Sequence, residues 1–295
     1  MRVIISGASG LIGTALTQSL RADGHEAIAL VRRPARDGEI TWDPANGVLA
    51  VDALDGADAV VHLAGAGIGD HRWTDDYRRE LLDSRVKSTT LIANTIAASA
   101  NRPPVLLSGS AIGFYGASDG SDLDETSPAG PGFLADLCVQ WEAATDAASA
   151  VGVRVVHLRT GIVLTAKGGA LKKMLPLFKL FVGGKFGNGK QWQSWISLPD
   201  EVAAIRHLIT TNVSGAVNLT APAPVTNAEF TKVLGSVLHR PTLLPVPRFG
   251  PALLLGGELA DALLYTGQKV LPHALQASGF EFQHSTLDIA LRAVL

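Results

Sequence analysis

The sequence predicts an α/β fold: a doubly wound parallel sheet with a smaller, mainly helical C-terminal lobe. Three observations predict it. Short apolar runs alternate with helical segments over the first half of the chain, the apolar runs are continuous, and the first of them leads into the glycine-rich stretch GASGLIG. Continuous apolar strands are typical of parallel sheets that helices cover on both faces. The alternation of strand and helix predicts right-handed β–α–β units.

The individual elements follow from the same pattern. From Thr165 onward, glycine and proline interrupt the chain, and less regular structure is expected. We therefore predict a first domain over residues 1–164, to which 199–220 return, and a smaller lobe over 165–198 and 221–295. The expected strands are Arg2–Ser6, Ala27–Val31, Ala59–Leu63, Val105–Ser108 and Val153–Leu158, and the expected helices lie near Leu11–Asp23, Asp75–Ser99 and Gly132–Val151.

Composition restricts the classes of partner. The 25 Lys and Arg residues against 27 Asp and Glu give a net charge of −2, which offers no electrostatic reason to expect nucleic acid or an anionic membrane. The one cysteine, Cys138, excludes an internal disulfide and fits a reducing compartment. No signal peptide or membrane span is recognisable, so a cytoplasmic protein is expected. The histidines show no ligand spacing, and no metal site is predicted.

The stretch GASGLIG predicts a dinucleotide-binding loop of the Rossmann type. Its glycines allow a tight turn, a close approach to a pyrophosphate and close helix–sheet packing. The helix that follows offers free N–H groups and a positive dipole to a phosphate. A glycine-rich turn without a ligand is the alternative. The expected cofactor contacts here are Gly7, Ser9, Gly10, Leu11, Ile12 and Gly13.

The end of the second strand selects the cofactor. NAD-binding sheets carry an acidic residue about 20 residues after the glycines, where it holds the ribose hydroxyls. Here the chain reads LVRRP, with Arg32 and Arg33 in that place. A guanidinium suits a 2′-phosphate because it makes charge-assisted, bidentate contacts. The sequence therefore predicts NADP(H), unless both arginines are ordinary solvated loop residues.

Several motifs in order resemble the short-chain dehydrogenase/reductase superfamily. They are GASGLIG, the LAG of HLAG, SGSAIGFYG and LRTGIVL. The segments RRELLDSRVKSTTLIA, LCVQWEAA, FGNGKQWQSWISLPDE and VLPHALQASGFEF resemble its atypical, epimerase-like branch, which includes the SDR39U1-like family. This resemblance covers nearly the whole chain and implies the fold and the cofactor more strongly than a reaction.

The resemblance also implies further site residues. The ends of the strands and one helix would face the cofactor. For Glu80 and Arg85 on that helix the alternative is an ordinary exposed charged face, and for Val163 it is a place in the apolar core. The segment after FGNGK would close over the substrate, or its indoles would pack between the lobes. The implied cofactor contacts are Leu63, Ala64, Gly65, Glu80, Arg85, Ser108 and Val163, and the implied substrate contacts are Gln191, Trp192, Ser194 and Trp195.

The usual proton-transfer pair of the superfamily is missing. Its hydride chemistry uses a serine and a Tyr-x-x-x-Lys motif, in which the lysine lowers the pKa of the tyrosine. Ser110 matches the serine, but Leu134 and Cys138 stand where the tyrosine and lysine are expected. Tyr115 is a candidate proton donor, with no lysine nearby in the sequence. Packing roles are the alternatives for Ser110 and Tyr115.

Two functions from different classes therefore remain open. The first is an NADP(H)-dependent oxidoreductase or epimerase-like enzyme that acts on a small molecule between the lobes. The second is a non-catalytic NADP(H)-binding sensor or scaffold, which the missing Tyr-x-x-x-Lys favours. Arg32 and Arg33 disfavour a flavin or sugar-nucleotide binder without nicotinamide. The apolar segment at 249–265 is expected to pack in the lobe or to form the surface of a homodimer.

Overall fold

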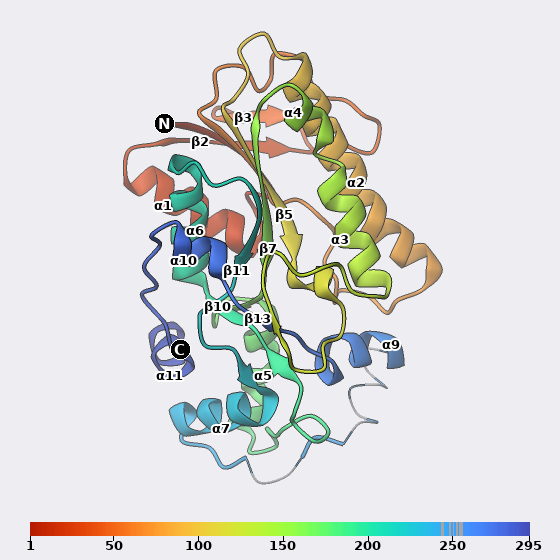
Figure 1. Cartoon of the computed structure of the whole chain (residues 1–295), viewed down its shortest axis with the longest axis vertical. Coiled ribbons are helices and arrows are strands. Elements are labelled where there is room, and N and C mark those ends of the chain that lie inside the picture. The colour runs from red at the N-terminus through yellow and green to blue at the C-terminus, as the bar shows by residue number, and fades with distance from the viewer. Residues whose placement is uncertain (243–244, 248, 250, 252, 254–255) are drawn as a thin grey trace.

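The computed structural model describes residues 1–242, 245–247, 249, 251, 253 and 256–295. Its centre is a seven-stranded sheet whose neighbouring strands are all parallel, in the order β11-β7-β5-β4-β1-β2-β3 (Figure 1). The winding direction reverses between β1 and β4, where a Rossmann sheet opens its ligand crevice. The strands are β1 (Arg2–Ser6), β2 (Glu26–Val31), β3 (Glu39–Thr41), β4 (Ala59–His62), β5 (Val105–Ala111), β7 (Arg154–Thr160) and β11 (Gly215–Leu219).

Helices cover both faces of this sheet. One face packs against α1 (Leu11–Ala22), α6 (Leu198–Thr210) and α10 (His273–Ala277), and the other against α2 (Asp75–Ala98), α3 (Phe133–Ala143) and α4 (Asp146–Ala150) (Figure 1). Successive strand residues therefore enter different cores: Ile5 packs with the α1 and α6 side, and Ile4 packs with the α2 side. This double burial explains why the strands read as continuous apolar runs.

All five predicted strands are present, with shifted ends in four of them. The single helix predicted over Gly132–Val151 is wrong, because the chain breaks it into α3 and α4. At the break, the hydroxyl of Thr145 donates to the carbonyl of Glu142 at 2.7 Å and competes with the helical hydrogen bonds. The short strand β3 was not predicted. The strand β11 lies inside the segment 199–220 and pairs with β7 in the large sheet.

The rest of the chain builds a second core around Leu175, Phe178, Trp195 and Phe230. Leu275 of α10 nevertheless belongs to the core of the large sheet, so the last part of the chain contacts both regions. In the apolar segment at 249–265, residues 250, 252, 254 and 255 lie outside the described residues. The remaining elements are η1 (Ile112–Tyr115), β6 (Asp122–Leu123), β8 (Ile162–Leu164), α5 (Gly169–Lys179), β9 (Trp192–Gln193), β10 (Trp195–Ser197), β12 (Val225–Thr226), α7 (Asn227–Leu238), α9 (Gly257–Ala260), η2 (Asp261–Tyr265), β13 (Lys269–Val270) and α11 (Leu287–Val294).

None of the described helices is both long enough and apolar enough to cross a lipid bilayer.

Candidate cofactor and substrate site

The glycine loop lies directly against the end of β4. Gly7 has a φ of +69°, and a Cβ there would lie 2.7 Å from the backbone carbonyl carbon of Leu63. A Cβ on Gly13 would lie 2.2 Å from the carbonyl oxygen of Gly7. Both positions therefore require glycine. No side chain caps α1, whose N-cap residue is Gly10, so its first N–H groups stay available to an anion.

The other loop residues divide between solvent and packing. Ser9 is exposed, whereas Leu11 and Ile12 are half-buried against the core of the large sheet. A Cβ on Gly168, just before α5, would lie 2.9 Å from a methyl carbon of Leu11. The glycine loop thus packs against the end of β4 through Gly7. At its other end, the side chain of Leu11 packs against Gly168 at the start of α5.

A chain of hydrogen bonds between uncharged side chains holds the end of β1, where the glycine loop begins. His62 is fully buried at the end of β4, with Nδ1 2.5 Å from the Ser6 hydroxyl and Nε2 3.1 Å from the Ser88 hydroxyl. Ser88 donates its proton to the carbonyl of Ser84, so it accepts from Nε2–H, and Nδ1 accepts from Ser6. Burial, with a smaller contribution from Arg85, lowers the pKa of His62 to about 3. The imidazole is therefore neutral and ties β1, β4 and α2 together.

The two arginines after β2 differ. Arg33 forms a bidentate pair with Glu39, at 2.7 and 2.6 Å, and its hydrogen bonds hold the pKa of Glu39 down at about 2. Arg32 is exposed and makes no hydrogen bond or ion pair with any residue that the structure describes. Arg32 is thus the arginine whose guanidinium is available to a ligand, while Arg33 already has a partner.

The end of β4 and the helix α2 meet at Arg85. Its Nη2 donates to the carbonyl of Ala66 at 2.9 Å, and Gly65 lies against the guanidinium. The guanidinium also lies 5.0 Å from the ring of Trp141. No carboxylate among the described residues pairs with this half-buried cation, and desolvation lowers its pKa. A half-buried guanidinium without a counter-charge is suited to an anionic or hydroxyl-rich ligand.

The remaining predicted cofactor residues have different surroundings. Glu80 is exposed on α2 and forms no bond with Arg85 or with any other described residue. Val163 in β8 pairs with Ile196 and packs partly into the core of the large sheet. Ser108 is fully buried in β5. The structure therefore brings Leu63, Ala64, Gly65 and Arg85 together beside the glycine loop and leaves Glu80 apart.

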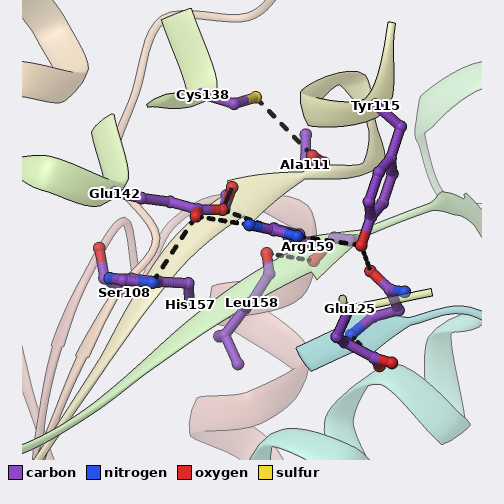
Figure 2. Close-up of polar contacts among 12 residues, drawn as sticks. Ser108, Ala111, Tyr115, Glu125, Cys138, Glu142, His157, Leu158 and Arg159 are labelled. Carbon is purple, nitrogen blue, oxygen red and sulfur yellow. Dashed lines mark hydrogen bonds and ion pairs between the residues drawn. The ribbon is translucent and has the colours of Figure 1, made fainter. Parts of the chain in front are cut away.

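At the neighbouring strands β5 and β7, a charged network surrounds Ser110. Its hydroxyl donates to Oε1 of Glu142 at 2.7 Å. Glu142 also forms a bidentate pair with Arg159, both distances being 2.8 Å (Figure 2). Burial would raise the pKa of Glu142, but hydrogen bonds from Arg159 and Ser110 and the charge of Arg159 hold it below its usual range. Glu142 is therefore an ionised, fully engaged carboxylate and a weak base.

Tyr115 belongs to the same network. Its hydroxyl donates to Oδ1 of Asn218 at 2.7 Å and accepts from Nη1 of Arg159 at 3.0 Å (Figure 2). The side chain is buried, and burial raises its pKa despite the neighbouring guanidinium. The backbone N–H of Asn218 donates to Oε1 of Glu125 at 2.9 Å. Tyr115 thus joins η1 to β7 and β11, and its proton is engaged within the protein.

At the expected Tyr-x-x-x-Lys positions, α3 presents no side chain that ionises near neutral pH. Leu134 lies near Gly113, and Cys138 is buried with its Sγ 3.7 Å from the carbonyl of Ala111 (Figure 2). Burial raises the pKa of Cys138 to about 11, so its thiol keeps its proton at neutral pH.

The predicted substrate residues separate into two pairs. Gln191 and Trp192 border a pocket of about 300 Å³, together with the 117–120 and 265–267 segments. Ser194 and Trp195 are fully buried. The Ser194 hydroxyl donates to Gln268, and the Trp195 indole donates to Ala223. Only the first pair is therefore accessible to a small molecule in this conformation.

Sequence reasoning missed the charged partners of this site. Neither Glu142 nor Arg159 was among the predicted site residues, and Arg159 comes directly after the predicted strand Val153–Leu158. The signal was present: Arg159 follows an apolar run in VRVVHLRT, and a buried arginine requires a carboxylate. Glu201 of α6 was also missed. It is fully buried, accepts from Thr160 at 2.9 Å, and burial raises its pKa to about 8.

Comparison with known proteins agrees with this geometry. Residues 3–220 match the model of the NAD dependent epimerase/dehydratase family, and residues 246–294 match a domain of unknown function, DUF1731. An epimerase family protein of Mycobacterium bovis is 46% identical over 291 residues, covering 98% of this chain and 96% of that protein.

Two solved structures are also similar over the whole chain. The crystal structure of human epimerase family protein SDR39U1 (isoform 2) with NADPH superposes with a TM-score of 0.89 at 36% identity, over 100% of this chain and 99% of that one. A nucleoside-diphosphate sugar epimerase of Corynebacterium glutamicum gives a TM-score of 0.81 at 37% identity, over 100% of this chain and 58% of that one.

Proposed function

The chain belongs to the NAD dependent epimerase/dehydratase family, and we propose that it binds NADP(H) and catalyses a redox reaction on a small hydroxyl or carbonyl compound. The observation that carries the proposal is the glycine loop packed against β4 with the unpaired Arg32 exposed after β2. The human relative whose structure contains NADPH supports the choice of cofactor.

The residues present fit such a dinucleotide. Gly7 and Gly13 leave a cradle that any Cβ would fill, and the uncapped start of α1 would hold the pyrophosphate. Arg32 would hold the 2′-phosphate, and the half-buried Arg85 would meet the ribose or phosphate beside Gly65. When bound, the cofactor supplies or accepts a hydride.

Ser110 would orient the substrate. Because its proton is donated to the ionised Glu142, its oxygen is left to accept a hydrogen bond. A substrate hydroxyl meets that requirement, whereas a carbonyl oxygen does not. Neither Tyr115, whose proton is held by Asn218, nor Cys138 supplies a proton in this conformation. Water or a substrate group would therefore carry the proton, and alignment would supply the rate enhancement.

One observation favours a second function. The positions of the usual tyrosine and lysine hold Leu134 and Cys138, and the proton of Tyr115, the other candidate donor, is engaged by Asn218. A protein that binds NADP(H) without turning it over, as a sensor or scaffold, is consistent with this absence.

A fluorescence titration with NADPH and NADH tests the cofactor. We expect NADPH to bind more tightly, and Arg32→Ala to weaken NADPH binding about ten- to a hundredfold because a charged phosphate contact is lost. Arg33→Ala is the matched control and should have a smaller effect, since Arg33 is already paired with Glu39. Equal binding of both nucleotides would contradict the assignment of NADP(H).

A second assay separates the enzyme from the binder. NADPH oxidation is followed across a panel of small carbonyl compounds, and NADP⁺ reduction across the corresponding alcohols. Turnover that Ser110→Ala reduces, with NADPH affinity unchanged, supports the enzyme. If NADPH binds but no compound is turned over, the non-catalytic function gains support.

A further inference from the structure

A cluster of apolar side chains is exposed where α5 ends. Leu177, Leu180, Phe181 and Val182 are 40, 71, 59 and 59% exposed. They lie beyond Leu171, Leu175 and Phe178, through which the same helix packs into the core of the second lobe. We call these four residues the α5 apex. Scattered exposed apolar residues are ordinary, but a contiguous group of this kind marks an interaction surface.

The backbone presents Phe181 under strain. Its φ is +64°, and it occupies the left-handed position of a helix-ending turn. The N–H of Val182 donates to Leu177 at 2.9 Å, and that of Phe181 donates to Phe178 at 3.0 Å. Glycine is the usual residue at this position, and a bulky side chain there is unfavourable. Because Phe181 stays largely exposed, burial within the chain does not compensate for the strain.

Positive charge is concentrated in the segment of the chain that carries the α5 apex. No Asp or Glu occurs between residues 147 and 199, a stretch with six lysines. Lys172, Lys179 and Lys185 are exposed and pair with no carboxylate among the described residues. The guanidinium of Arg240 lies 4.8 Å from the ring of Phe181. The net charge of −2 conceals this local excess, because the acidic residues lie elsewhere in the chain.

Exposed apolar side chains next to unpaired cations favour some binding partners over others. A second copy packing apex to apex would bring Lys179 and Arg240 of each copy near those of the other, which is unfavourable. An anionic phospholipid surface matches both features: lysines attract its headgroups, and leucine and phenylalanine insert at the boundary with the acyl chains. We propose that the α5 apex docks the protein reversibly on anionic membranes, in contrast to the expectation from overall charge.

Vesicle flotation of the full-length protein tests this surface. Vesicles contain either phosphatidylcholine alone or phosphatidylcholine with about a third phosphatidylglycerol. We expect the protein to float only with the anionic vesicles and to be released at high salt. Lys179→Glu should weaken binding roughly tenfold, since each lysine near an anionic surface contributes about fivefold and the new glutamate repels.

Phe181→Gly is the decisive variant because it separates docking from folding. It removes the aromatic ring but relieves the backbone strain, so we expect binding to fall severalfold while thermal stability holds or rises. Val51→Ser, at a position 58% exposed on the other lobe, is the matched control and should bind like the wild type.

Three results would overturn the proposal: no flotation with anionic vesicles, flotation that Phe181→Gly leaves unchanged, or a dimer in sedimentation velocity that Phe181→Gly abolishes. The last result would assign the α5 apex to self-association. None of these results bears on NADPH binding, which serves as the check that each variant is folded.

Discussion

Two buried polar clusters lie near the carboxyl ends of the central strands, and they are built on different principles. Under the glycine loop, His62 joins Ser6 and Ser88 through neutral hydrogen bonds. Beside β5, Glu142 and Arg159 form an ion pair to which Ser110 and Tyr115 are bonded. Both clusters fasten strand ends together, one without charge and one with it.

The two clusters should respond differently when one of their residues is replaced. A neutral cluster loses only hydrogen bonds when one member is replaced, whereas an ion pair leaves an uncompensated charge behind. The neutral cluster lies at the base of the glycine loop, and the charged one lies between β5, β7 and α3. Substitutions in these clusters and at the buried Glu201 should therefore differ in their effect on stability.

Glu142→Gln should have the largest effect. It leaves the buried guanidinium of Arg159 without its counter-charge, and we expect the free energy of unfolding to fall by about 3–5 kcal/mol. Denaturant unfolding of the variant and the wild type at pH 7 measures this fall in the free energy of unfolding. The double variant Glu142→Leu with Arg159→Met should recover part of that loss, because neither charge then remains buried. A double variant less stable than the single one would show that the pair is needed for packing, not for charge balance.

Glu201→Gln should change the pH dependence of stability. In the unfolded chain this carboxyl ionises above about pH 4.5, but in the folded protein its pKa is raised to about 8. The folded state therefore holds an extra proton in this window, and stability falls as pH rises, by about 1.4 kcal/mol per unit. Near pH 7.5 the variant should exceed the wild type by roughly 2–4 kcal/mol. Parallel unfolding curves at pH 5, 6, 7 and 8 would contradict this.

His62→Gln tests the neutral cluster. Losing two hydrogen bonds in a buried site should cost about 2 kcal/mol at pH 7. The folded pKa of His62 is lowered to about 3, so the wild type loses stability as pH falls below about 6.5, where the unfolded imidazole takes up a proton. The variant should lack this slope between pH 6.5 and 5. Thermal unfolding of both proteins across that range checks it, with Ser88→Ala as a milder control.

Tyr115→Phe should have the smallest effect. The change removes one hydroxyl bonded to Asn218 and Arg159, and we expect a loss of about 1 kcal/mol in the free energy of unfolding. If Tyr115 serves only to join η1 to β11, turnover of any substrate found should persist in the variant. Complete loss of turnover with retained stability would instead assign it the proton-donor role that the sequence suggested.

The glycine loop and the charged cluster also differ in how far they can be predicted from sequence. The glycine loop and the strands that flank it depend on local patterns, and their positions could be predicted. The charged cluster joins residues that are far apart in the chain: Tyr115 and Asn218 are 103 positions apart. Only the register of β7 against β5 and β11 brings them together. The break between α3 and α4 coincides with one side-chain hydrogen bond of Thr145, and the spacing of apolar residues in the sequence does not indicate it.

The position of β11 has a consequence for synthesis of the chain. This edge strand comes from residues 215–219, after the chain has passed through β8, α5 and β10. Until the ribosome has made it, one side of β7 has unpaired N–H and C=O groups, although the rest of the sheet has emerged. An exposed strand edge of this kind recruits other strands. We therefore expect stalled or truncated chains that end before residue 215 to aggregate, and chains extended past 219 to stay dispersed.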